Sequence, residues 1–199
     1  MPTDASTLLL AALIGLIFGS FVTALSYRLP RGIGISTGRS KCMSCGTTLG
    51  PTDLVPVLSW VVSRGRCRSC GASVSARYPA IELITMAACV SAALVAPVGP
   101  LLFVLMMLAP SLVASAAVAT EHGRVPVSLG VASAVLIGAW AWMASPSWGG
   151  ALGMVAALGV LMFASRINIL RQCHVAPAAA LAIWLVAIAF SRAPGAGTP

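Results

Sequence analysis

Long apolar stretches alternate with short polar connections along most of the chain. Six stretches carry at most one charged residue each: Leu8–Tyr27, Pro79–Ala96, Leu101–Thr120, Val127–Ala144, Gly150–Ser165 and Val175–Phe190. A helix rises about 1.5 Å per residue, so about 20 apolar residues cross the hydrocarbon layer of a membrane. The pattern therefore predicts an all-α polytopic membrane protein with about six transmembrane helices, of which the fifth is short.

The composition supports this prediction. Of the 199 residues, 59% are hydrophobic and only 8% are charged, and the mean hydropathy is +0.99. Soluble domains carry about 25% charged residues, because their surface must be hydrated. The formal net charge of +8 would suit a nucleic-acid partner. However, the basic residues gather in one segment beside an apolar stretch, so we expect a lipid bilayer as the partner and no nucleic acid.

The basic residues also predict the orientation of the chain in the membrane. Eight of the twelve lie between the first two apolar stretches: Arg28, Arg31, Arg39, Lys41, Arg64, Arg66, Arg68 and Arg77. With six alternating helices, Arg124, Arg166 and Arg171 fall on the same side, and Arg192 alone falls on the other. Lys and Arg concentrate in cytoplasmic loops, so the segment is expected in the cytoplasm and both termini on the opposite face. No Lys or Arg precedes the first stretch, which favours a retained helix over a signal peptide.

These features divide the chain into four parts. Residues 1–27 are expected to form the first transmembrane helix, and residues 28–78 a small cytoplasmic insert. Residues 79–192 are expected to form a transmembrane helical bundle, and residues 193–199, rich in Gly and Pro, a disordered tail. No internal repeat is evident.

The insert contains two cysteine pairs, Cys42-x-x-Cys45 and Cys67-x-x-Cys70, separated by 21 residues. A glycine follows each pair and tolerates the positive φ of a tight turn around a metal ion. Two such knuckles supply the four thiolates of a tetrahedral structural Zn²⁺ site. Two disulfides are the alternative in an oxidising compartment, but the expected cytoplasmic location favours zinc. A closed four-sulfur site leaves no position for substrate, so its expected role is to hold together a loop with little core of its own.

Carboxylates are few, which restricts any acid–base chemistry. The acidic residues are Asp4, Asp53, Glu82 and Glu121. Asp53 is placed to cap a turn or a helix in the insert. Glu82, at the start of the second apolar stretch, is expected to pair with Arg77 or to contact substrate. Glu121 and His122 are weak candidates for acid–base work, because neighbours on a helix point about 100° apart; we interpret them as interfacial polar residues.

Several short motifs occur in order around the insert. They are Gly19-Ser20-Phe21, Tyr27-Arg28-Leu29-Pro30-Arg31-Gly32, Arg39-Ser40, Asp53-Leu54-Val55-Pro56-Val57-Leu58-Ser59-Trp60, Arg64-Gly65-Arg66-Cys67-Arg68, and Ser75-Ala76-Arg77-Tyr78-Pro79 followed by Glu82-Leu83. Together they closely resemble the amino-terminal part of the bacterial prepilin leader peptidase/N-methyltransferase family, the type IV prepilin peptidases of the peptidase A24 type. The resemblance covers residues 19–85, about a third of the chain.

The resemblance implies a multi-pass protein of the bacterial inner membrane that serves type IV pilus or type II secretion biogenesis. Family members cleave the leader of prepilins or pseudopilins on the cytoplasmic side, and then methylate the new amino-terminus with S-adenosylmethionine. Cleavage in the family uses two aspartates. When the corresponding segments are aligned, Ala119 and Ala151 occupy the aspartate positions, and no aspartate follows Asp53 anywhere in the sequence.

The missing aspartates leave several hypotheses open. An aspartic protease needs two close carboxylates that share a proton, so the chain is not expected to cleave leaders. It could retain only methyl transfer. In that reaction the protein mainly has to orient the amine toward the methyl group of S-adenosylmethionine, whose sulfonium is already activated. It could instead be a non-catalytic pseudo-peptidase that binds prepilins or an assembly partner, including another membrane subunit that supplies aspartates. Two alternatives remain. Cleavage could use a glutamate pair formed by Glu82 and Glu121, or the chain could be an unrelated membrane module with a zinc insert.

Overall fold

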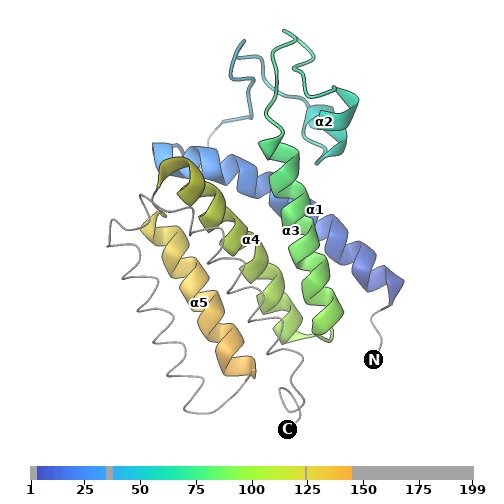
Figure 1. The fold of residues 1–199 in the computed structure, drawn as a ribbon, viewed down its shortest axis with the longest axis vertical. Helices are drawn as coiled ribbons and strands as arrows, with labels where there is room; N and C mark the ends of the chain where they lie inside the picture. Colours follow the sequence, from blue (N-terminus) through green and yellow to red (C-terminus); the bar gives the residue numbers. More distant parts are fainter. Residues whose placement is uncertain (1–3, 35–37, 124, 145–199) are drawn as a thin grey trace.

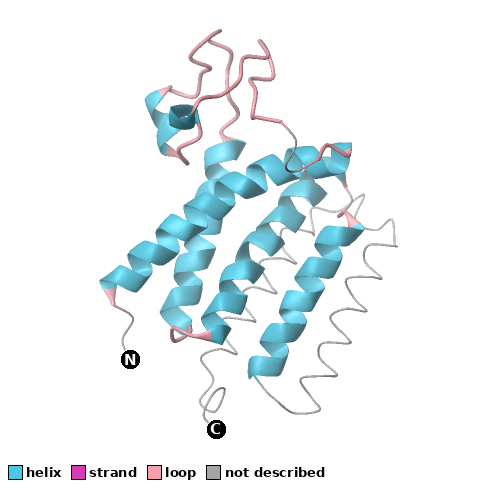
Figure 2. Cartoon of the chain, turned by 180° about the vertical axis from the view of Figure 1, so that it is seen from behind, coloured by secondary structure: helices cyan, strands magenta, loops and turns pink. Residues whose placement is uncertain are grey.

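The computed structural model of the chain describes residues 4–34, 38–123 and 125–144. Long helices dominate this part of the chain: α1 (Ala5–Arg28), α3 (Arg77–Val95), α4 (Pro100–His122) and α5 (Val127–Ala144) (Figure 1). Short helical turns lie between or beside them: η1 (Leu29–Arg31), η2 (Pro51–Asp53) and α2 (Leu58–Val62). Apart from two isolated β-bridges, the described residues contain only helices and loops (Figure 2).

Among the described residues, three helices are long and apolar enough to cross a membrane: Ala5–Arg31, Arg77–Val95 and Pro100–His122. They correspond to the first three predicted spans. Helix α5 coincides with the fourth predicted stretch, although its strongly apolar part, Ser128–Met143, is shorter. The fifth and sixth predicted spans, Gly150–Ser165 and Val175–Phe190, and the predicted tail lie outside the described residues. The all-α, membrane-type character is thus confirmed for the described part, and the number of six spans stays a prediction.

Local sequence signals define where the long helices begin and end. The carboxylate of Asp4 accepts a hydrogen bond from the backbone N–H of Thr7 at 3.1 Å, so it caps the start of α1. Helix α4 begins with Pro100 in its first turn, where a missing backbone donor costs nothing. It ends at His122, and the capping residue Gly123 has a φ of +64°, the left-handed conformation that closes many helices.

Helices α1 and α3 pack in direct backbone contact. A Cβ atom added to Gly15 would lie 2.6 Å from the Cα atom of Met86, and one added to Gly19 would lie 2.6 Å from the Cα atom of Glu82. Small residues let helices in a membrane approach closely and gain van der Waals contact. The two glycines, one turn apart on α1, therefore determine how close α3 can come.

Helix α4 lies against α1, α3 and α5 and is the most buried of the three span-length helices. Its contact with α5 includes a polar cluster in which the Ser111 and Ser133 hydroxyls are 2.7 Å apart, and those of Ser115 and Ser133 are 3.3 Å apart. Ser133 is almost completely buried. Such hydroxyl contacts between helices supply specificity where apolar packing alone supplies little.

The segment between α1 and α3 protrudes from one end of the bundle, where α1 ends and α3 begins (Figures 1 and 2). It carries η2, α2 and all four insert cysteines. We call this segment, residues 29–76, the insert; the sequence predicted residues 28–78 for it, but α1 includes residue 28 and α3 begins at residue 77. Charged side chains gather at the same end of the bundle: Arg28, Arg31, Arg77, Glu121 and His122.

Candidate metal centre

The first cysteine pair closes a small hairpin. The N–H of Gly46 donates to the carbonyl of Cys42 at 2.9 Å, and the N–H of Cys42 donates to the carbonyl of Thr47 at 2.9 Å. The turn requires a φ of +72° at Gly46, which a residue with a Cβ atom adopts only with strain. The glycine after the cysteine pair thus has the role that the sequence predicted.

The second pair repeats this hairpin. The N–H of Gly71 donates to the carbonyl of Cys67 at 2.9 Å, the N–H of Cys67 donates to that of Ala72 at 2.8 Å, and Gly71 has a φ of +73°. Each hairpin also has one antiparallel bridge at matching positions, Lys41 with Thr48 and Arg66 with Ser73. The expectation that the chain has no internal repeat is therefore wrong. The sequences of the two hairpins match as well: each has a basic residue before its first cysteine, the pattern Cys-x-Ser-Cys-Gly, and a hydroxyl side chain two residues after the glycine.

The two hairpins bring their four sulfur atoms together. The Sγ atoms of Cys42, Cys45, Cys67 and Cys70 all lie within 4.8 Å of one another, and those of Cys42 and Cys70 are 3.9 Å apart. Zn–S bonds of about 2.3 Å in a tetrahedron place sulfur atoms about 3.8 Å apart. All four are free thiols, whereas a disulfide needs an S–S distance of about 2.05 Å. The cluster can therefore hold a metal ion such as zinc, as the sequence predicted.

The surroundings of the cluster favour partial ionisation of its thiols. Contact with the Thr47 hydroxyl, 3.2 Å from the Cys45 sulfur, lowers the pKa of Cys45 to about 6. Backbone hydrogen bonds from Cys70 and Ser69 lower the pKa of Cys67. The backbone hydrogen bond of Ala72 lowers the pKa of Cys70, but the neighbouring sulfurs and burial outweigh it and raise that pKa to about 11. Crowded thiols cannot all ionise unless a cation neutralises them, and a metal ion would be that cation.

Two side chains attach the residues between the hairpins to the second hairpin. The carboxylate of Asp53 accepts from the N–H of Gly50 at 3.0 Å and lies 3.2 Å from the guanidinium of Arg68. The indole N–H of Trp60 donates to the carbonyl of Val74 at 3.0 Å. Asp53 thus caps the short turn η2, as expected from the sequence, and also forms an ion pair that the sequence did not reveal.

Glu82 connects the insert to the bundle. Its side chain is only 8% exposed, and its carboxylate accepts a hydrogen bond from the N–H of Val57 at 2.6 Å and interacts with the Ser20 side chain. Val57 has φ +60° and ψ −51° and forms the centre of a strained γ-turn. The expected pairing of Glu82 with Arg77 is wrong, because the carboxylate binds a backbone donor that is distant in sequence.

Arg77 pairs with Glu121 instead. Its guanidinium contacts the Glu121 carboxylate and also donates to the carbonyl of Ala117 at 2.8 Å, which joins the start of α3 to the end of α4. The Nε2 atom of His122 lies 3.5 Å from the other carboxylate oxygen of Glu121. Glu82 and Glu121 therefore have different partners.

The two positions aligned with the family's aspartates contribute no carboxylate. Ala119 is 8% exposed in the last turns of α4, and its carbonyl accepts the N–H of Gly123. Ala151 lies outside the described residues.

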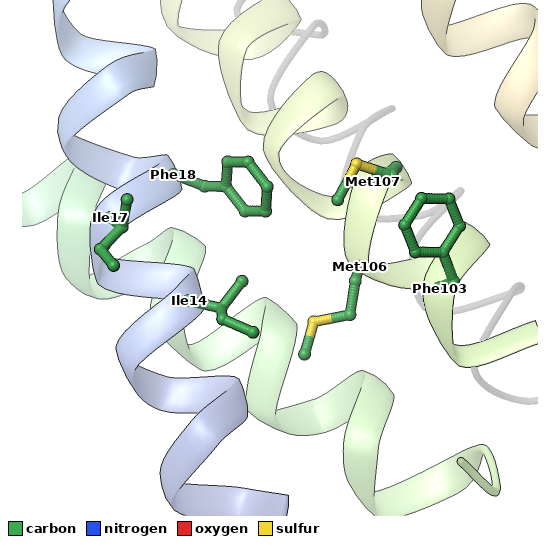
Figure 3. A pocket seen from close by; sticks show the side chains of 6 residues that line it. All are labelled: Ile14, Ile17, Phe18, Phe103, Met106 and Met107. Atoms are coloured by element: carbon green, nitrogen blue, oxygen red, sulfur yellow. The ribbon is translucent and has the colours of Figure 1, made fainter. Parts of the chain in front are cut away.

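An apolar groove of about 350 Å³ runs between α1 and α4 (Figure 3). Its lining consists of Ile14, Ile17, Phe18, Phe103, Met106 and Met107. None of these side chains carries a group that could transfer a proton or bind a charge. The groove is therefore suited to hydrocarbon and not to acid–base chemistry.

The described part is a membrane-type helical bundle, and a cluster of four cysteines that could hold a metal ion is inserted after its first helix. Residues 13–96 match the bacterial peptidase A24 N-terminal domain. The chain is 34% identical over 152 residues to a type 4 prepilin-like proteins leader peptide-processing enzyme of Escherichia coli, covering 66% of this chain and 56% of that protein. The amino-terminal region of this chain therefore belongs to the prepilin leader peptidase family.

Two further relatives carry the name prepilin leader peptidase/N-methyltransferase. The protein of Bacillus subtilis is 44% identical over 81 residues, covering 41% of this chain and 32% of its own. The protein of Burkholderia pseudomallei is 34% identical over 175 residues, covering 75% of this chain and 54% of its own. The chain thus spans about half the length of the Escherichia coli and Burkholderia pseudomallei relatives. No solved structure matches it.

Proposed function

We propose that this chain is an inner-membrane protein of type IV pilus or type II secretion biogenesis that binds prepilins or pseudopilins and does not remove their leaders by itself. One observation carries the proposal. Glu82 and Glu121 are the only carboxylates after Asp53, and they bind Val57 and Arg77 respectively.

Proteolysis of the aspartic type requires two carboxylates that share a proton, one activating water and the other protonating the scissile carbonyl. A glutamate used by this chain would first have to leave its partner. Release of Glu82 would leave the Val57 N–H without its acceptor, and release of Glu121 would break the ion pair between the start of α3 and the end of α4. Both changes cost folding free energy, which argues against a glutamate dyad.

The metal centre is proposed to bind one structural Zn²⁺. Four thiolates close the coordination sphere of zinc and leave no open position for substrate or water. The insert has few buried apolar side chains of its own: none of the residues in η1, η2 or α2 is buried. Zinc would therefore supply the folding free energy that a core usually supplies.

Methyl transfer is the second candidate activity. The relatives of Bacillus subtilis and Burkholderia pseudomallei carry both leader peptidase and N-methyltransferase in their name. Transfer from S-adenosylmethionine needs a bound and oriented amine rather than an aspartate dyad, so the loss of one activity does not require the loss of the other. Another membrane subunit that supplies aspartates would restore cleavage.

The insert is proposed to face the cytoplasm, on the basis of the Lys and Arg bias. A Thr47→Cys variant tests this orientation, because Thr47 is exposed in the first hairpin. An impermeant thiol reagent should label position 47 only after lysis of the cells. Labelling of intact cells would refute the orientation, and the unsubstituted chain serves as the control for the native thiols.

The activity test combines the purified chain with a prepilin and follows the intact mass. We expect no loss of the leader, retained binding of the prepilin, and, if methyl transfer persists, the gain of one methyl group on a precleaved substrate with S-adenosylmethionine. The Bacillus subtilis relative is the positive control. Leader removal that Glu82→Gln or Glu121→Gln abolishes would overturn the proposal and identify the glutamate pair as the active site. Absence of both binding and activity would also overturn it.

A further inference from the structure

The outer face of α2 is apolar. Leu58 lies one turn before Val61 and Val62 on this short helix. The three side chains are 58%, 57% and 62% exposed. The preceding residues Leu54 and Val55 are also exposed. The opposite face carries Trp60, which is bound to Val74 inside the insert. We call the five exposed side chains the α2 patch; such a concentration of apolar surface marks a contact site.

The depth of α2 follows from its attachment to α3. Val57, which directly precedes α2, is hydrogen-bonded to Glu82. Glu82 is the sixth residue of α3, so it lies about 7 Å along the axis from the start of this membrane-type helix. Figure 1 shows α2 beside the end at which α3 begins. The α2 patch is therefore attached at the level where a membrane changes from hydrocarbon to headgroups.

The residues after the patch are basic. Arg64, Arg66 and Arg68 are exposed, and no acidic residue occurs between Asp53 and Glu82. Asp53 is itself paired with Arg68. An apolar face next to arginines is the combination that binds the headgroup and upper acyl region of anionic lipids.

We propose that the α2 patch inserts into the surface of the same membrane that the bundle crosses, with Arg64 and Arg66 in contact with anionic lipid headgroups. The insert then rests on the bilayer and does not extend freely into solvent. Continuity with the membrane-type helices and the positive charge of the flank favour a lipid surface over a protein partner. This proposal requires that the bundle spans a membrane and does not depend on the binding of prepilins.

Photo-crosslinking of the full-length chain in lipid vesicles tests the proposal. Benzoylphenylalanine replaces Val61 in one variant, and the vesicles contain phosphatidylcholine and phosphatidylglycerol with a labelled trace of each. Leu13 of α1, which is 50% exposed within a span, is the positive control site, and Ser44, exposed in the first hairpin, is the negative one. Unchanged metal content in each variant shows that the insert is folded.

We expect lipid adducts at position 61 in a yield comparable with that at position 13 and severalfold above that at position 44. The yield at position 61 should fall severalfold in vesicles of phosphatidylcholine alone and in the double variant Arg64→Gln, Arg66→Gln. A yield at position 61 no higher than at position 44, while position 13 reacts, would overturn the proposal. A crosslink from position 61 to a protein instead of lipid would overturn it as well. A yield that changes with neither lipid charge nor the arginines would overturn the assigned role of the headgroups.

Discussion

The carboxylate of Glu82 accepts a hydrogen bond from the backbone N–H of Val57 and thereby attaches the four-cysteine insert to helix α3. The bond joins a strained turn to a buried side chain: Val57 has a positive φ, and Glu82 is 8% exposed. A strained backbone conformation persists where several surrounding contacts hold it in place. Glu82 is thus a positioning residue for the insert, although its place at a helix start made it a catalytic candidate.

Truncation of Glu82 should loosen the insert without removing its metal. In Glu82→Ala the Val57 N–H loses its acceptor, which costs about 1–3 kcal/mol when the site stays dry. We expect faster tryptic cleavage at the exposed Arg64 and Arg66 and an unchanged metal content. Glu82→Gln is the matched control, because its amide oxygen can still accept the bond. Equal cleavage rates for wild type and Glu82→Ala would contradict this role.

The contact between α1 and α3 should not tolerate a methyl group. In Gly19→Ala the new Cβ atom would lie 2.6 Å from the Cα atom of Glu82, so the helices must separate. Overpacking of this kind costs about 1–3 kcal/mol, and the Tm in detergent should fall. Gly130→Ala in α5 is the control: its Cβ atom meets nothing within 4 Å, and alanine favours a helix over glycine by about 1 kcal/mol. An equal Tm for both variants would show that α1 and α3 are not in close contact.

Metal analysis of the purified chain should find close to one equivalent of zinc. Replacement of Cys42, Cys45, Cys67 or Cys70 by serine should reduce the content strongly, because three sulfurs leave the tetrahedron open. Cys89→Ala is the control, since Cys89 is buried in the bundle away from the cluster. Metal content that survives all four serine substitutions, or disulfides in the purified chain, would refute the zinc site.

Zinc affinity should rise with pH. Protons compete with zinc for thiolates, so a thiol whose pKa lies above the ambient pH must release its proton on binding. The pKa of Cys45 is lowered to about 6, so this thiol is mostly ionised at pH 7; the pKa of Cys70 is raised to about 11, so this thiol is protonated. Binding at pH 7 should therefore release protons, and affinity should weaken further as the pH falls through 6. Competition with a chromophoric chelator at pH 6, 7 and 8 measures the trend.

Thr47→Val provides a residue-level check of this pH dependence. Loss of the hydroxyl removes the largest cause of the low Cys45 pKa, so the weakening of zinc binding should begin at a higher pH than in wild type. Thr48→Val, an exposed neighbour, is the control. A pH profile that is the same in both variants would show that Thr47 does not tune the thiolate.

The helices could be predicted from sequence because the length of an apolar stretch can be read directly along the chain. Apolar length alone identified the regions of α1, α3 and α4, and the first and last residues of α5, since a membrane requires an uninterrupted apolar helix. The four-cysteine cluster was predictable for a similar reason. Ligand spacing within a knuckle is local, and a metal ion requires two knuckles to meet.

Long-range polar contacts could not be predicted. Glu82 lies close in sequence to Arg77, yet Arg77 binds Glu121 and Glu82 binds Val57. These pairings depend on how α3 and α4 pack and on where the insert folds back, which single-sequence patterns do not specify. The repeated hairpin could be predicted only in part: the pattern Cys-x-Ser-Cys-Gly occurs twice in the sequence, whereas the matching backbone hydrogen bonds are a feature of the fold.

The repeated hairpin has a consequence for how such a centre could arise. One hairpin supplies two thiolates, which is half of a tetrahedral shell, so a peptide with a single hairpin could saturate a zinc ion only by recruiting a second copy. Covalent connection of two copies turns that bimolecular encounter into an intramolecular one, at an effective concentration of the order of millimolar. The centre therefore has the architecture of a homodimer fused into one chain, and the connecting segment between the halves is free to carry α2.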